Sequence, residues 1–309
     1  MHAISFPHRL AAAAGAGALL AAALPAAAHA DRLETAAPGA ANLATGGGFQ
    51  AWSAPQADGT HRLTIRRPDG VVLTPDIPAF GAPVDPSIGT TLARGARGNS
   101  AADRGLSAVY SRCEGASVSE NCDVFRFDLF GQEESRVEAL ATPGASETAP
   151  SVNLGTWAFA RRGGARPGTY SYTTLGKRLR RLTPTLALET AVSPTRVAFT
   201  FRTSRGGGVQ VRRASGEGRP LQAASGLATT PRSVQVTRYR AGWLVPEAGA
   251  TRVFQTRRFA GSGGPFRLAV DEAPRTLPAG VTSAVGGTSA LFLRYLDGEG
   301  VKTMDPAIR

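Results

Sequence analysis

The segment Thr156-Trp157-Ala158-Phe159-Ala160 decides the fold, because segments of the same kind recur along the whole chain. Each copy is a short apolar strand that carries an aromatic residue. The aromatic positions that align are Trp52, Tyr110, Phe159, Phe199, Trp243 and Phe292. They follow one another at a mean interval of about 48 residues, which matches a four-stranded propeller blade.

A turn and a second alternating strand follow each aromatic segment, as in His61–Arg67, Asp123–Leu129 and Val209–Arg213. Six such units fill residues 31–309. The sequence therefore predicts an all-β fold: a single six-bladed β-propeller domain of four-stranded antiparallel blades. A pair of β-sandwiches has enough strands but does not favour this repeat length. Either Asp31–Thr35 or the tail Val301–Ile308 could supply the strand that completes the last blade.

Composition supports this class. The 309 residues include 37 glycines and 21 prolines, and the longest stretch without either after the first thirty residues is Ala116–Phe130. This excludes an all-helical protein, and a hydrophobic content of 42% excludes a disordered one. We expect the run Gly206-Gly207-Gly208 to form a flexible turn between strands. The Gly/Ala/Arg-rich segment Gly89–Gly105 is expected to be a mobile surface loop.

Residues 1–30 have the pattern of a secretory signal peptide. Arg9 precedes an Ala/Leu-rich stretch, Pro25 interrupts it, and Ala28-His29-Ala30 provides small residues for cleavage before Asp31. The alternative is an uncleaved membrane anchor. Cleavage would give a protein that is secreted or extracytoplasmic, in the cell envelope, and not transmembrane.

Cys113 and Cys122 are the only two cysteines. In an oxidising compartment we expect them to form a disulfide that joins the two sides of a hairpin, with Glu114–Asn121 as its loop. A reactive thiol pair is the alternative, although the CxxC spacing is missing.

The segment Ala149-Pro150-Ser151-Val152, followed by Trp157–Arg161, Gly168-Thr169-Tyr170 and Leu179–Thr183, resembles one blade of the TolB-like, WD-repeat-like bacterial propellers. The stretch from Val109 to Asp128, with its cysteine pair, resembles the secreted actinobacterial members. The "Ser-Pro-Asp-Gly" turn typical of the family is absent. The resemblance implies an envelope or extracellular propeller that holds partners.

The formal net charge is +12, and 33 of the 35 basic residues are arginine. This charge could attract anionic envelope polymers, or it could simply be dispersed over a solvated surface. The arginines occur singly or in doublets such as Arg180-Arg181 and Arg212-Arg213, without a row of aromatic residues. Nucleic acid is therefore not an expected partner.

Motifs for nucleotide binding, calcium loops and serine nucleophiles do not occur, and His61 is the one histidine after residue 30. We therefore predict no cofactor and no metal site. Acidic tripeptides open several units instead, and we expect them at one mouth of the central channel. The predicted arc consists of the acids Glu34, Asp85, Glu147 and Glu189, faced by the arginines Arg232 and Arg275.

This arc could bind a cation or a cationic ligand. Two of its carboxylates could act as an acid–base pair on a sugar, or all could have a structural role at the turns. We expect a monomeric, non-catalytic binding or scaffold module whose partner is an envelope or extracellular protein. The alternatives are a carbohydrate-active hydrolase or lyase, and a cationic protein held on anionic polymer by charge alone.

Overall fold

A computed structural model describes the chain at residues 31–92, 100–102, 105–114, 120–248, 250–256, 275–277, 281–285 and 294–303. The expected signal segment and Phe292 lie outside these residues, as does much of the segment Gly89–Gly105. All regular elements of the described part are β-strands. It contains no helix with the length and hydropathy needed to span a membrane.

The strands form six four-stranded antiparallel sheets, each running outward from the ring axis. The first three blades are β2 (Ala41–Gly46), β3 (Phe49–Pro55), β4 (His61–Arg66) and β5 (Val72–Leu73); β6 (Ser87–Thr90), β7 (Leu106–Cys113), β8 (Cys122–Asp128) and β9 (Glu134–Arg136); and β10 (Ala145–Asn153), β11 (Thr156–Gly163), β12 (Gly168–Thr173) and β13 (Arg178–Thr183).

The other three blades follow in chain order, and the last one is completed by the first strand of the chain. They are β14 (Glu189–Val192), β15 (Arg196–Thr203), β16 (Gly206–Arg213) and β17 (Leu221–Leu227); β18 (Arg232–Val236), β19 (Ala241–Glu247), β20 (Ala250–Gln255) and β21 (Arg275–Leu277); and β22 (Ser283–Val285), β23 (Arg294–Leu296), β24 (Gly300–Thr303) and β1 (Arg32–Ala36).

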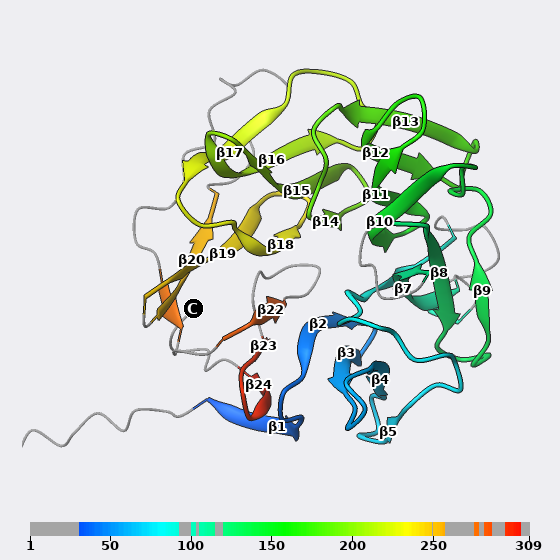
Figure 1. The fold of residues 1–309 in the computed structure, drawn as a ribbon, viewed down its shortest axis with the longest axis vertical. Coiled ribbons are helices and arrows are strands. Elements are labelled where there is room, and N and C mark those ends of the chain that lie inside the picture. Colours follow the sequence, from blue (N-terminus) through cyan, green and yellow to red (C-terminus); the bar gives the residue numbers. More distant parts are fainter. Residues whose placement is uncertain are drawn as a thin grey trace, which may run out of the picture. The chain divides into compact units, whose positions relative to one another are not determined.

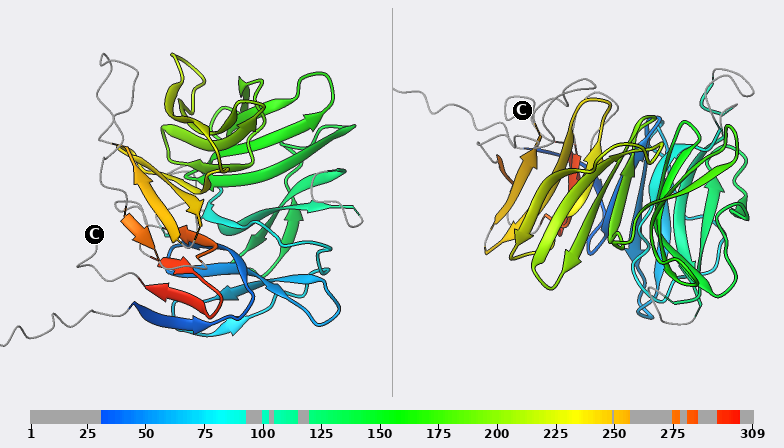
Figure 2. Two further views of the ribbon diagram at one scale, coloured as in Figure 1. Left: turned by 60° about the vertical axis from the view of Figure 1, so that its left-hand side comes forward. Right: turned by 90° about the horizontal axis from the view of Figure 1, so that it is seen from above.

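The inner strands of neighbouring blades contact one another around a complete circle, from β2 through β22 and back to β2. Figure 1 shows β10, β14, β18, β22 and β2 around the centre, and Figure 2 shows the sheets standing side by side. The predicted six-bladed propeller is confirmed. Both candidate segments take part in closure, because the N-terminal β1 pairs with β24 as the outermost strand of blade 6.

The repeated aromatic residue packs toward the preceding blade, which explains its periodicity. Each junction between blades has its own cluster of buried apolar side chains. Trp52, Tyr110, Phe159, Phe199 and Trp243 are each at most 2% exposed and occupy five of these clusters. At the sixth junction the structure describes Tyr295 in this position. Burying one large aromatic side chain per junction holds adjacent sheets face to face.

Hydrogen bonds also join the inner edges of the blades at all six junctions. They link Asn42 Nδ2 to Val84 O, Leu154 N to Thr90 Oγ1, Ser151 Oγ with Thr190 Oγ1, Val234 N to Glu189 Oε2, Ala284 N to Ser233 Oγ, and Leu43 N to Ser283 Oγ.

Two local expectations differ from the structure. The run Gly206–Gly208 is the start of β16 and not a turn. A side chain at Gly208 would come within 2.5 Å of the Phe201 ring and 2.7 Å of the Ala224 carbonyl oxygen, so glycine is needed where these neighbours approach the strand. The acidic tripeptide at Glu34 belongs to β1 and the Arg275 tripeptide to β21, both outermost strands; the inner strands of blades 1 and 6 are β2 and β22.

Candidate functional site

Three of the six residues predicted for the arc lie together at the inner edges of the blades. Asp85 lies two residues before β6 begins in blade 2, while Glu189 and Arg232 begin β14 and β18 in blades 4 and 5. The charges of Asp85 and Arg232 both act on Glu189. Because blade 3 separates blades 2 and 4, this influence indicates that both carboxylates face the ring axis.

The environment of these two carboxylates favours their protonated forms. Burial raises the pKa of Asp85 to about 6. Burial, with the nearby charge of Asp85, raises the pKa of Glu189 to about 8, although hydrogen bonds from the backbone N–H groups of Val234 and Ser233 oppose the shift. Solvent reaches Asp85 even though protein atoms surround its carboxyl group, as expected for a side chain that faces the ring axis.

Glu147 has a structural position away from this pair. Its side chain is fully buried between blades 2 and 3, and its Oε1 accepts a 2.8 Å hydrogen bond from Arg161 Nε. Arg161 also donates to the Leu140 carbonyl oxygen at 2.8 Å and lies over the Tyr170 ring at 4.6 Å from its centroid. Burial raises the pKa of Glu147, and the ion pair with Arg161 counteracts it. Glu147 therefore belongs to a buried ion pair and not to the arc expected from the sequence.

Glu34 holds the closure strand β1 in place. Its carboxylate accepts hydrogen bonds from Gln50 Nε2 at 2.5 Å, from Arg294 Nε at 2.8 Å and from the Thr303 hydroxyl. Burial raises its pKa, but these hydrogen bonds and the charge of Arg294 outweigh burial and lower the pKa to about 2. Glu34 therefore joins blades 6 and 1 and does not line the ring axis. Arg275, on β21, is also on an outermost strand.

The predicted disulfide is present. Cys113 and Cys122 are cross-strand partners that end β7 and begin β8, and their sulfur atoms are bonded. The flanking residues Glu114 and Asn121 pair through their backbones, with a 3.2 Å hydrogen bond from Glu114 N to Asn121 O. The bridge therefore fixes the base of the hairpin expected from the sequence.

A hollow that the sequence reasoning missed lies at the opposite ends of the strands in blades 3 to 5. We call it the arginine hollow. It has a volume of about 890 Å³, and its lining residues are Thr173, Leu175, Gly176, Arg178, Arg180, Pro194, Thr195, Arg196, Arg213, Ala214, Ser215, Arg238 and Tyr239.

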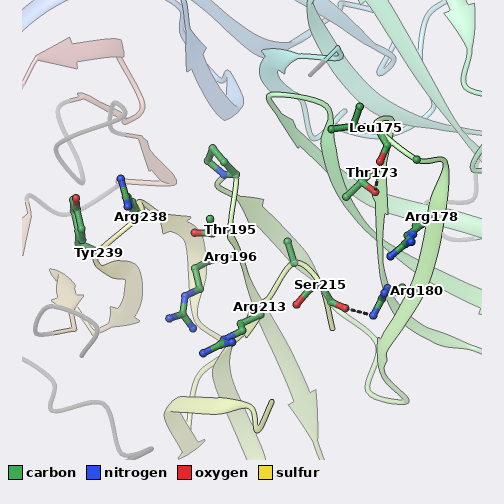
Figure 3. A pocket seen from close by; sticks show the side chains of 13 residues that line it. Thr173, Leu175, Arg178, Arg180, Thr195, Arg196, Arg213, Ser215, Arg238 and Tyr239 are labelled. Atoms are coloured by element: carbon green, nitrogen blue, oxygen red, sulfur yellow. Dashed lines mark hydrogen bonds between the residues drawn. The ribbon is translucent and has the colours of Figure 1, made fainter. Parts of the chain in front are cut away.

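The described charged residues that line the arginine hollow are all basic. Among its described lining residues are five arginines and no aspartate, glutamate, histidine, lysine or cysteine. Arg196 and Arg213 are direct cross-strand partners on β15 and β16, and Figure 3 shows their side chains running beside one another. One residue of each doublet Arg180-Arg181 and Arg212-Arg213 lines the hollow, Arg180 and Arg213, but nothing in the sequence indicated that the fold brings these two together.

A metal site finds no support in the described part of the chain, where no group of three or more acidic, histidine or cysteine side chains is placed to hold an ion. The candidate sites are thus the Asp85–Glu189 pair near the ring axis and the arginine hollow at the other ends of the strands.

No family model matches the chain, and no curated protein matches it. Among solved structures, TolB from Acinetobacter baumannii has a TM-score of 0.47 and 13% identity over 71% of this chain, which spans 52% of that protein. The β-propeller domain of the Trilobed protease from Pyrococcus furiosus has a TM-score of 0.45 and 9% identity over 86% of this chain and 97% of that one.

The GH74 xyloglucanase from Xanthomonas campestris has a TM-score of 0.47 and 11% identity over 84% of this chain. The chain spans only about half the length of TolB and 44% of the xyloglucanase. Such distant similarities to proteins of different activities carry no argument about function.

Proposed function

We propose that the chain is an exported, monomeric β-propeller that binds a component of the cell envelope without chemically changing it. The signal pattern of residues 1–30 and the Cys113–Cys122 disulfide support an oxidising, extracytoplasmic location. The rigid ring provides a scaffold on which loops and hollows are held in fixed positions.

The observation that carries the non-catalytic proposal is the lining of the arginine hollow. General acid–base catalysis needs a group that gains and loses a proton near the working pH, and covalent catalysis needs an activated nucleophile. The described lining supplies arginines, which stay charged at all ordinary pH values, and hydroxyl groups, with no carboxyl group, histidine or cysteine among the lining residues. Such a surface is suited to hold a ligand and not to transform it.

A pull-down with the purified exported chain against its own envelope fraction tests this proposal. Immobilised protein is incubated at low and high salt, with calcium or with a chelator, and both the retained material and the supernatant are analysed. Retention of a defined envelope component that is recovered chemically unchanged supports the binding function. Complete lack of retention, or release of cleaved fragments into the supernatant, would contradict it.

One observation favours a second candidate, a carbohydrate-active hydrolase or lyase. Asp85 and Glu189 are two neighbouring carboxyl groups whose pKa values differ, at about 6 and about 8, so that at neutral pH Glu189 could donate a proton while Asp85 is ionised, as an acid–base pair requires. The same pull-down with a Glu189→Gln variant tests this activity. Sugar release that depends on Glu189 would support the enzyme, whereas identical supernatants from both proteins would exclude this pair as the catalyst.

A further inference from the structure

The positive charges of the arginine hollow are poorly balanced. Arg178, Arg213 and Arg238 have no carboxylate partner among the described residues. Arg180 approaches Glu217 at 3.8 Å, but that carboxylate is 69% exposed, so water and salt screen the pair. The hollow therefore presents a net positive surface to solvent.

Two of these arginines lie where their positive charges repel each other. Arg196 and Arg213 lie directly opposite one another on β15 and β16, where like charges repel. Burial lowers the pKa of Arg196, and the charge of Arg213 lowers it further. The fold keeps this pair at the hollow although a neutral residue at either position would relieve the repulsion. An anion placed between the two guanidinium groups would turn the repulsion into attraction.

The charges are spread along the hollow and not gathered at one point. Arg178 and Arg180 come from β13 on one side, Arg196 and Arg213 from the middle, and Arg238 from the turn after β18 on the other side (Figure 3). A single small anion offers one anionic group to these three groups of arginines. A chain with an anionic group on each repeating unit can contact all three.

The shape and the remaining lining residues fit the same ligand. A volume of about 890 Å³ lies in the upper part of the range of about 300–1,000 Å³ for small-molecule sites, large enough for several linked units. The planar guanidinium group binds phosphate and carboxylate through paired hydrogen bonds. Leu175, 79% exposed, and Tyr239, 43% exposed, add apolar surface for the uncharged backbone of such a chain.

We propose that the arginine hollow is a binding site for a segment of an anionic polymer that carries a phosphate or carboxylate group on each repeating unit. This inference rests on the proposed binding function and names its ligand class and its site. Phosphate and carboxylate polymers share the chemistry that the arginines recognise, so the two sources are compared in the test.

The test measures binding of the purified exported chain to fluorescently labelled inorganic polyphosphate and to labelled polygalacturonate, with neutral dextran as the control ligand. The variant Arg196→Gln/Arg213→Gln removes the central pair. The matched variant Arg202→Gln/Arg205→Gln lowers the net charge equally and changes the other end of the same β15–β16 hairpin. We expect at least a tenfold loss of affinity for the first variant and less than a twofold loss for the second.

The outcomes separate a site from a general effect of charge. Equal losses in the two variants would overturn the proposal, because overall charge would then account for binding. Lack of binding of both polymers to the unmodified protein would also overturn it, whereas the envelope pull-down judges the proposed function independently. Stronger binding of polyphosphate than of polygalacturonate, or the reverse, would identify the anionic group while supporting the site.

Folding of the variants is checked by thermal denaturation. We expect the melting temperature of Arg196→Gln/Arg213→Gln to be close to that of the unmodified protein, because relief of the repulsion offsets other contacts that the substitution removes. If this variant does not fold, Arg178→Gln/Arg238→Gln replaces it. Both of these side chains are exposed and without a described carboxylate partner, so the comparison with Arg202→Gln/Arg205→Gln keeps the same meaning.

Discussion

Replacing Glu34 by glutamine should weaken the closure of the ring. The substitution keeps the size of the side chain, but it replaces one of the two accepting oxygens by an NH2 donor and removes the negative charge that pairs with Arg294 across β1 and β23. It leaves the side chains near the ring axis unchanged. The variant therefore distinguishes the role of Glu34 as a closure residue from the ligand-binding role expected from the sequence.

The magnitude follows from the pKa of Glu34 and from its exposure. A fall in pKa from 4.5 to about 2 corresponds to about 3 kcal/mol of preference for the charged form in the folded state. The Arg294 side chain is 34% exposed, so solvent screens part of the attraction. We expect Glu34→Gln to lower the free energy of unfolding by about 1–2 kcal/mol at pH 7.

The effect should also depend on pH in one direction. A carboxyl group whose pKa is lower in the folded state stabilises the fold above its unfolded pKa, and this contribution is lost as the pH falls toward the folded value of about 2. The difference between the unmodified protein and Glu34→Gln should therefore shrink by more than half between pH 7 and pH 3. All other interactions contribute equally to the free energy of unfolding of the two proteins, so the difference between them reports on Glu34.

Urea unfolding followed by tryptophan fluorescence measures this difference, and hydrogen exchange of the β1 and β24 amides shows whether the loss is local to the closure. Glu138→Gln is the matched control, because Glu138 is 74% exposed and pairs only loosely with Arg136, at 3.5 Å between Oε2 and Nη1. If Glu34→Gln and Glu138→Gln have the same free energy of unfolding at pH 7, or if the deficit of Glu34→Gln is as large at pH 3 as at pH 7, the reasoning is refuted.

Three further predictions concern the remaining charged and covalent contacts. Glu189→Gln should stabilise the fold by about 1–2 kcal/mol at pH 9 and leave it unchanged at pH 4. The reason is that the folded pKa of Glu189 is raised, so the unmodified protein loses stability as the pH rises toward about 8. Urea unfolding at the two pH values measures this, and a pH-independent effect would contradict it. Arg161→Met should lower the free energy of unfolding by about 3–5 kcal/mol, because it leaves the Glu147 carboxylate buried without its partner. Thermal denaturation of the double variant Glu147→Gln/Arg161→Met should show that part of this stability is recovered. Cys113→Ser/Cys122→Ser should lower the free energy of unfolding by about 2–3 kcal/mol, and a reducing agent should destabilise the unmodified protein but not the variant.

The repeat of aromatic strands was sufficient to predict the fold, because each anchor has the same task at every junction. Trp52, Tyr110, Phe159, Phe199 and Trp243 fill equivalent clusters, so selection for the same contact leaves a regular interval in the sequence. The junction between blades 5 and 6 is the exception. There the structure places Tyr295 in the junction, close after the predicted Phe292, which lies outside the described residues.

The candidate site was only partly predictable, because short motifs do not indicate which strand of a blade they begin. The same Glu-Thr-Ala tripeptide lies at the end of the outermost strand β1 at Glu34 and begins the inner strand β14 at Glu189. The arginine hollow was harder still to predict. Its residues come from three blades and span positions 173 to 239, and the sequence shows only scattered basic residues at these positions.

The inner strands explain why Glu189 receives a backbone hydrogen bond from Val234 and Asp85 has no equivalent bond. Blades 1, 3 and 5 each have a bulge with one residue at positive φ, at Asn42, Ala149 and Ser233. The backbone N–H after the bulge donates to the preceding blade, from Val234 to Glu189 and from Leu43 to Ser283.

The equivalent residue after Ala149 is Pro150, which has no N–H to give. Asp85 aligns with Glu189, because the neighbouring Ser87 pairs with Val109 just as Ala191 pairs with Ala198. It therefore lacks the hydrogen bond that Glu189 receives from Val234 N, and no described residue replaces that donor. Pro150 thus removes one of the backbone donors that the equivalent carboxyl group has in blade 4, and among the described residues Asp85 has no hydrogen-bond donor while Glu189 has two.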